Sequence, residues 1–308
     1  MRFSVQLPTD RVDEYEAFCT SEAIAENAQR AEELGFDACY VTEHPFPPDG
    51  WLASGGHHAL DPFVSLAVAA GATRRIRLHS NILVLGYRNP FLTAKAVASL
   101  DVVSGGRVIV GTGAGYLEKE FAALGAVFDE RNERSDEAIG AMKAAWTGES
   151  VERSGLGFEA KGNTMAPKPV QSPHPPIWVG GNSPRAIRRA VDLADGWSPF
   201  PLPGAGTART RTSAIESVED LARGIDRMRE YAASQGRSGD LDVNFVPFGL
   251  QMNAKSLPDV SMLTDQFGAL AEVGVTWLSV GLPTPSRAGY QEALAEFAAH
   301  FVDARAGS

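Results

Sequence analysis

The sequence predicts an α/β protein built as one (β/α)8 barrel of the TIM type over residues 1–308. Short apolar runs alternate with helical patterns along the whole chain, which is typical of βα units in a parallel sheet. Eight such runs, each followed by a helix, fit into a chain of 308 residues. A doubly wound open sheet is the alternative. The predicted strands are 3–7, 38–42, 76–82, 107–113, 176–181, 196–200, 242–250 and 277–282.

The helical segments between these runs carry start and stop signals. The first segment has an apolar face from Ile24 to Leu34 and ends at Gly35, which suits the left-handed backbone that follows many helices. Three later helices should begin where a capping side chain precedes a proline. These pairs are Asp61–Pro62, Asn89–Pro90 and Ser183–Pro184.

Three segments exceed what a minimal barrel of about 250 residues needs. They are insertions after strands 2, 4 and 6, at 45–60, 148–175 and 201–216. The first and third extend from the carboxyl ends of strands, where barrel active sites lie, so we expect them to overhang the site as substrate walls or lids. Because 201–216 is poor in large apolar residues, a disordered surface insertion is its alternative.

Composition limits the class of partner. Hydrophobic residues make up 44% of the chain and the net charge is −10, which opposes a general attraction to nucleic acid or anionic membranes. The sequence offers neither an apolar window long enough for a membrane span nor a signal-peptide core. Cys39 lies in an apolar stretch, which favours a buried thiol over a disulfide with Cys19. We expect a cytoplasmic protein that binds small molecules.

His44 stands just after the second predicted strand, in "VTEHPFPP". An imidazole at the carboxyl end of a barrel strand is placed to exchange a proton near neutral pH. The alternative is a surface histidine without a role in the chemistry. His57 and His58 are adjacent and therefore point in different directions, and no carboxylate or thiol joins them at metal-ligand spacing. No metal site is expected.

Two segments after later strands are candidates for cofactor contacts. "GTGAGY", at 111–116, lacks both the spacing of a dinucleotide loop and its downstream acidic residue, but its glycines would let a flat ring approach or form a tight turn. Asn81, at the end of the third strand, offers a donor to a ring carbonyl or to the backbone.

The second segment, "GGNSP" at 180–184, offers backbone N–H groups and side-chain donors before a helix. That pattern suits either phosphate binding or a plain helix cap.

Taken together, these segments resemble the bacterial luciferase-like family of (β/α)8 flavin and deazaflavin oxidoreductases. The chain looks most similar to its actinobacterial branch, which uses coenzyme F-420 rather than FMN. The resemblance implies a homodimer that transfers a hydride between F-420 and a small organic substrate. The stretches that carry it are "RAEELGFDACYVTEH", "SGGRVIVGTGAGYLEKEFAALG", "PPIWVGGNSPRAIRRAVDLADGW" and "LAEVGVTWLSVGL".

The resemblance also implies roles for individual residues. His44 would act as acid or base beside the reactive ring carbon. Asn81 and Ile82 match a non-proline cis peptide that supports the ring. Ala114, Gly115 and Tyr116 match a segment that lines the ring. The phosphate-binding segment is matched by Gly180, Gly181, Asn182 and Ser183.

Other functions remain compatible with the sequence. One is an FMN-dependent monooxygenase that uses reduced flavin and O2, and another is a deazaflavin- or flavin-binding protein without catalysis. A cofactor-free barrel hydrolase is the most distant. It would need a carboxylate pair at the strand ends, where the sequence has Glu43 and Asp195, and we expect both of these to be structural.

Overall fold

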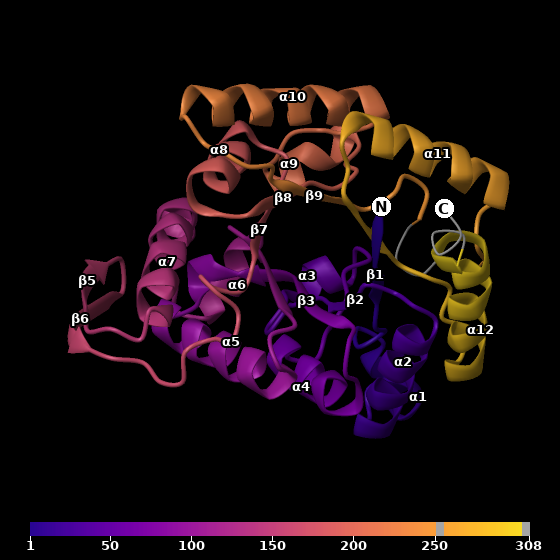
Figure 1. Cartoon of the computed structure of the whole chain (residues 1–308), viewed down its shortest axis with the longest axis horizontal. Coiled ribbons are helices and arrows are strands. Elements are labelled where there is room, and N and C mark those ends of the chain that lie inside the picture. Colours follow the sequence, from indigo (N-terminus) through magenta and orange to yellow (C-terminus); the bar gives the residue numbers. More distant parts are fainter. Residues whose placement is uncertain (251–255, 304–308) are drawn as a thin grey trace.

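The computed structural model describes residues 1–250 and 256–303, and its centre is a closed barrel of eight parallel strands (Figure 1). Their order around the barrel is their order along the chain, and the last strand pairs with the first. The predicted fold is confirmed, and the open sheet is wrong. The strands are β1 (Arg2–Gln6), β2 (Ala38–Val41), β3 (Arg77–Val84), β4 (Val108–Gly113), β7 (Ile177–Gly180), β8 (Gly196–Ser198), β9 (Asp242–Phe245) and β10 (Trp277–Val280).

The longer helices surround this barrel on its outer side (Figure 1). Among the described residues, no helix is both long and apolar enough to cross a membrane. The α-helices are α1 (Tyr15–Phe18), α2 (Ser21–Glu33), α3 (Asp49–Leu52), α4 (Pro62–Ala72), α5 (Pro90–Ser104), α6 (Glu118–Ala123), α7 (Arg131–Trp146), α8 (Pro184–Leu193), α9 (Thr207–Thr210), α10 (Val218–Ser234), α11 (Val260–Val273) and α12 (Arg287–Phe297).

The predicted helix boundaries are confirmed by their caps. Asp61 Oδ1 accepts the Phe63 N–H at 2.9 Å before α4, and Asn89 Oδ1 accepts the Phe91 N–H at 3.0 Å before α5. Gly35 follows α2 with a φ of +80°, the left-handed conformation expected there. These local signals fix where each helix starts and therefore how each loop leaves the barrel.

The barrel interior is a filled core. The Trp178 and Trp277 rings lie 5.1 Å apart, and His79 meets Trp178 edge-on at 4.9 Å. Ser4 Oγ lies 3.2 Å from His79 Nδ1, and burial lowers the pKa of His79 to about 3, so this histidine is neutral. Because side chains fill the centre, a ligand must bind at the rim.

The insertion at 148–175 contains an antiparallel hairpin that was not predicted from the sequence, formed by β5 (Val151–Gly155) and β6 (Phe158–Asn163). It packs on the outer helices: the Phe158 ring meets Phe91 of α5 at 5.4 Å, and Glu137 of α7 accepts the Leu156 N–H at 2.6 Å. The hairpin stands between α7 and β7, on a connection that enters the amino end of a strand. It therefore lies away from the rim that carries barrel active sites.

Candidate active site

The predicted site residues lie in the carboxyl-terminal parts of β3 and β7 or shortly after β2, β4 and β7, and these four strands are consecutive neighbours around the barrel. Topology therefore gathers them on one side of the carboxyl-terminal rim. Neighbouring strands lie about 4.8 Å apart, so the ends of β2 and β7 are about 14 Å apart along the rim. An elongated ligand with a reactive ring at one end and an anion at the other suits that span.

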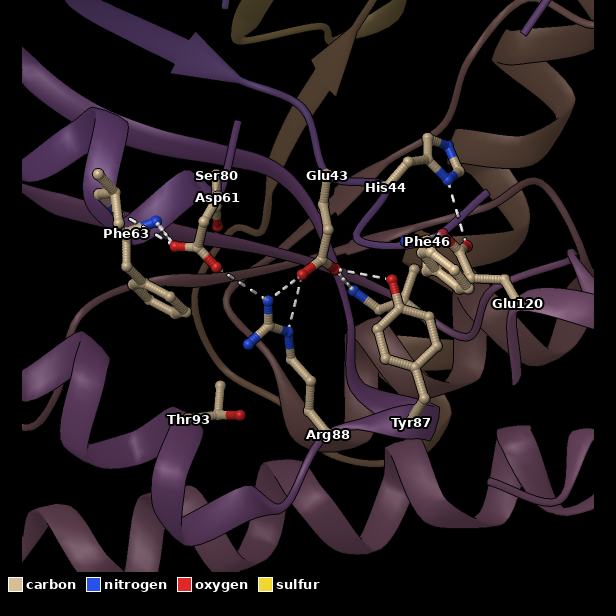
Figure 2. A network of polar contacts seen from close by, with 12 residues as sticks. Glu43, His44, Phe46, Asp61, Phe63, Ser80, Tyr87, Arg88, Thr93 and Glu120 are labelled. Carbon is tan, nitrogen blue, oxygen red and sulfur yellow. Dashed lines mark hydrogen bonds and ion pairs between the residues drawn. The ribbon is translucent and has the colours of Figure 1, made fainter. Parts of the chain in front are cut away.

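His44 is held by a buried carboxylate from a different part of the chain (Figure 2). Its Nδ1 lies 3.2 Å from Glu120 Oε2, while Glu120 Oε1 accepts the Phe46 N–H at 3.2 Å. Glu120 belongs to α6 and is only 2% exposed. Glu120 was not predicted from the sequence, because it stands among charged residues in a short helix, where a carboxylate is normally solvated.

Aromatic side chains of the 45–60 insertion cover His44, as that segment's predicted overhang requires. The ring centroid of His44 lies 4.4 Å from that of Trp51 and 5.2 Å from that of His57, and Tyr116, in the segment after β4, approaches it at 6.1 Å. A Cβ at Gly56 would lie 2.2 Å from the Trp51 ring, so this glycine admits the indole. Burial, aided by His44, lowers the pKa of His57 to about 4. His57 is therefore neutral at physiological pH.

Glu43, the neighbour of His44, has a structural role, as expected. Its carboxylate accepts hydrogen bonds from the Val84 N–H at 2.7 Å, the Tyr87 hydroxyl at 3.1 Å and Arg88 Nε at 2.8 Å (Figure 2). Burial, then the Glu43 charge, raises the pKa of Tyr87 far above its usual value. The two adjacent residues thus have different roles: Glu43 links the ends of two strands, and His44 lies at the rim.

The peptide bond between Asn81 and Ile82 is cis, which is the geometry that the family resemblance implied there. Both residues are partly accessible. The Ile82 side chain occupies the space above the glycines of β4, since a Cβ at Gly113 would lie 2.1 Å from Ile82 Cδ1. At Gly111 a Cβ would meet Ser80 O at 2.2 Å. The interpretation that these glycines leave room for a flat ring is wrong, because the protein's own atoms fill it.

Ala114, Gly115 and Tyr116 continue from β4 and are all partly accessible. Gly115 has a φ of +84°, and a Cβ there would lie 2.6 Å from both Val84 and Phe121, so the backbone passes close to these side chains. Burial raises the pKa of Tyr116 to about 12. Its phenol therefore stays protonated and is available as a hydrogen-bond donor.

At the start of α8, Asn182 has a different task from the one expected. Its Nδ2 donates to Phe200 O and Ser213 O, both at 2.9 Å, and its Oδ1 accepts the Phe200 N–H at 3.0 Å. Its own N–H donates to Thr212 Oγ1 at 2.8 Å. The expectation that Asn182 donors face an anion is wrong, because all of them are used within the protein.

The 201–216 insertion is a folded wall rather than a disordered segment. Leu202 and Ile215 form an antiparallel bridge, and α9 lies between them. Arg211 Nη2 reaches Glu118 Oε2 of α6 at 3.2 Å. The insertion therefore joins the β4 and β7 sides of the rim.

Backbone donors remain at this helix start. Within the described chain, no hydrogen bond uses the N–H groups of Gly181 and Ser183, whereas Ser183 Oγ caps α8 by accepting the Ala186 N–H at 3.2 Å. Arg185 binds Asp136 of α7 at 3.0 Å, so its charge is already paired. Free N–H groups at the positive end of a helix dipole are the chemistry that holds a phosphate.

In residues 1–250 and 256–303, no group of three or more His, Cys, Asp or Glu side chains could hold a metal ion. Cys19 and Cys39 are both free thiols, as expected.

The fold and this rim define the class of protein: a (β/α)8 barrel whose polar groups gather at the carboxyl ends of adjacent strands. The family model for luciferase-like monooxygenases matches residues 1–253. The chain belongs to that family.

Similar proteins within the family differ in the cofactor that they use. An uncharacterised protein of Mycobacterium tuberculosis is 30% identical over 284 residues, covering 87% of this chain and 91% of the relative. The FMNH2-dependent dimethylsulfone monooxygenase of Pseudomonas putida is 33% identical over 220 residues, 70% of this chain and 55% of the relative. The F420-dependent glucose-6-phosphate dehydrogenase of Amycolatopsis mediterranei is 26% identical over 279 residues, covering 84% and 81%.

Solved structures share the fold. The monooxygenase RslO1 from Streptomyces bottropensis superposes with a TM-score of 0.76 at 21% identity, covering 99% of this chain and all of the other. The coenzyme F420-dependent tetrahydromethanopterin reductase from Methanopyrus kandleri gives a TM-score of 0.74 at 18% identity, covering 98% and 99%.

Proposed function

We propose that this chain is an F-420-dependent oxidoreductase that moves a hydride between the coenzyme and a small organic substrate. The observation that carries the proposal is the layout of the rim. A covered, carboxylate-bound imidazole follows β2, and N–H groups that no described residue accepts follow β7, on one continuous side of the barrel. The 26% identity to an F420-dependent dehydrogenase supports the choice of coenzyme.

The residues along this rim fit such a coenzyme. The N–H groups of Gly181 and Ser183 would hold its phosphate, with Gly180 leading into the turn. The partly accessible Asn81 and Ile82 of β3 and the residues after β4 would line its ring, and the Tyr116 phenol would donate to a ring or substrate oxygen. When bound, the coenzyme supplies the carbon that gives or takes the hydride.

His44 would manage the proton that accompanies this hydride. In a reduction it would protonate the substrate atom that becomes negative, and in an alcohol oxidation it would accept the hydroxyl proton. Trp51 and the neutral His57 cover the imidazole and limit its contact with water. A neutral organic substrate, such as an enone, imine or alcohol, suits a site with these aromatic walls.

An FMN-dependent monooxygenase is the second candidate, because the chain is 33% identical to an FMNH2-dependent enzyme. Titrating the purified protein with F-420 and, separately, with FMN distinguishes the two. We expect F-420 to bind at least about tenfold more tightly, a difference of about 1.4 kcal/mol. Tight binding of FMN without binding of F-420 would overturn the proposal.

A carrier without catalysis is separated by turnover. The enzyme should oxidise alcohols with F-420, or reduce enones or imines with its reduced form, and the His44→Ala variant should lose this activity while binding the coenzyme. Unaltered coenzyme binding with no turnover on any of these substrates would indicate a carrier.

A further inference from the structure

We propose that Glu120 is a positioning residue for His44: its carboxylate holds the proton on Nδ1 and leaves Nε2 as the atom that exchanges protons with substrate. This inference rests on the acid and base role given to His44 above. It concerns a residue that no sequence pattern marked.

The geometry assigns both oxygens of Glu120 to fixed tasks. Oε1 accepts the Phe46 N–H at 3.2 Å, and Oε2 lies 3.2 Å from His44 Nδ1. An ionised carboxylate only accepts hydrogen bonds, so the ring nitrogen that faces it must carry the hydrogen. The neutral imidazole then has its lone pair on Nε2.

The Glu120 carboxylate contacts two positions of the same loop. Phe46 follows His44 by two residues, so one carboxylate fixes both the backbone of the loop and the orientation of the ring. With a side chain 2% exposed, Glu120 cannot exchange these bonds for water without local opening. The α6 helix therefore carries a group from the end of β4 to the side chain that follows β2.

The other described groups around His44 do not offer a negative charge to its imidazole. His57, with a pKa lowered to about 4 by burial, is neutral, and the Tyr116 phenol is protonated. Trp51 packs on the imidazole as an aromatic ring. The nearby carboxylate of Glu43 already binds Val84 N–H, Tyr87 and Arg88. Among the residues that the structure describes, Glu120 is therefore the anion that faces the imidazole.

The Glu120→Gln variant removes the negative charge and keeps the size and shape of the side chain. The Gln amide oxygen can still accept the Phe46 N–H, but its NH2 group donates to His44 Nδ1 and forces the proton onto Nε2. We expect ¹⁵N NMR of histidine-labelled protein to show the Nδ1–H tautomer of His44 in the unaltered protein and the Nε2–H tautomer in the variant. A spectrum of His44→Ala identifies the signal.

Catalysis should respond in kcat rather than in binding. We expect kcat of Glu120→Gln to fall about 100-fold or more, as for the loss of general acid or base catalysis, with coenzyme Kd changed less than about threefold. Glu133→Gln, which alters an exposed carboxylate on α7, should match the unaltered protein in both measurements.

The NMR result does not depend on the coenzyme, so the two proposals fail separately. An Nε2–H tautomer in the unaltered protein, or an Nδ1–H tautomer retained by Glu120→Gln, overturns the positioning role even if F-420 binds and reacts. Should Glu120→Gln not fold, the tautomer of the unaltered protein still decides. Absence of F-420 binding would instead overturn the function and leave the tautomer assignment standing.

Discussion

The Glu43 carboxylate accepts the Val84 backbone N–H at 2.7 Å, which ties the carboxyl end of β2 to that of β3. Arg88 supplies the compensating charge through Nε at 2.8 Å. His44 follows Glu43 directly, and Ile82 lies two residues before Val84 in β3. The hydrogen bond between Glu43 and Val84 therefore fixes the position of the His44 imidazole relative to the Asn81–Ile82 peptide. Structural stability and site geometry thus depend on one buried carboxylate.

Arg88→Met should destabilise the protein strongly. The variant leaves the Glu43 side chain, 1% exposed, without its cation, and breaking a buried ion pair in this way costs about 3 kcal/mol or more. Urea unfolding followed by circular dichroism measures the change. Arg30→Met is the control, since it removes a surface pair with Glu33 and should cost less than about 1 kcal/mol. Equal losses in both variants would contradict a buried, compensated Glu43.

Asn182→Ala should loosen the 201–216 insertion. It removes three side-chain hydrogen bonds to the backbone of Phe200 and Ser213, a loss of about 2–3 kcal/mol. Trypsin should then cleave faster after the exposed Arg209 and Arg211.

Ser213→Ala is the control for Asn182→Ala, because Asn182 contacts only the backbone carbonyl of that residue. It should resist urea and trypsin like the unaltered protein. If Asn182→Ala changed coenzyme affinity alone, with stability and cleavage unaffected, the amide would be a cofactor donor after all.

His57 should make stability depend on pH. Its pKa is about 4 in the folded protein because of burial, against about 6.5 when unfolded, so the unfolded chain binds more protons between these values. The free energy of unfolding should therefore fall as the pH drops through this window, by about 2 kcal/mol from pH 7 to pH 5 for this group alone.

His57→Gln removes that titration. Its pH dependence should be shallower than that of the unaltered protein by the same about 2 kcal/mol, measured by urea unfolding at each pH. His58→Gln, at an exposed neighbour, is the control and should keep the full slope. Parallel curves for His57→Gln and the unaltered protein would show that His57 is solvated.

The sequence predicted the barrel well because the signals that define it are local. Apolar runs mark the strands, and caps such as Asp61 and Asn89 mark the helix starts, so the order of elements follows directly. The β5–β6 hairpin was missed because its strands are mostly exposed and lack a buried face to give alternation.

The site was only half predictable, for a physical reason. His44 could be placed because the end of a strand fixes its position, but Glu120 meets it across 76 residues of chain, and nothing local to either one encodes that contact. Asn182 was misread for the same reason, since its partners lie 18 and 31 residues away. Hydrogen-bond donors can be recognised in a sequence, whereas the fold decides which acceptors they meet.

Gly181→Ala tests whether the start of α8 binds a phosphate or only turns the chain. Gly181 has a φ of +104°, which an L residue adopts at a cost of about 1–2 kcal/mol, although its Cβ would meet Ala186 at an ordinary 3.5 Å. Relief of this strain re-aims the free N–H groups, so we expect coenzyme Kd to rise about tenfold, the loss of one hydrogen bond to a charged group. Gly268→Ala, at an exposed and open position within α11, should instead stabilise the protein by about 0.5–1 kcal/mol and leave Kd unchanged. A destabilised Gly181→Ala with unaltered Kd would mean that this glycine serves the turn alone and that the phosphate is bound elsewhere.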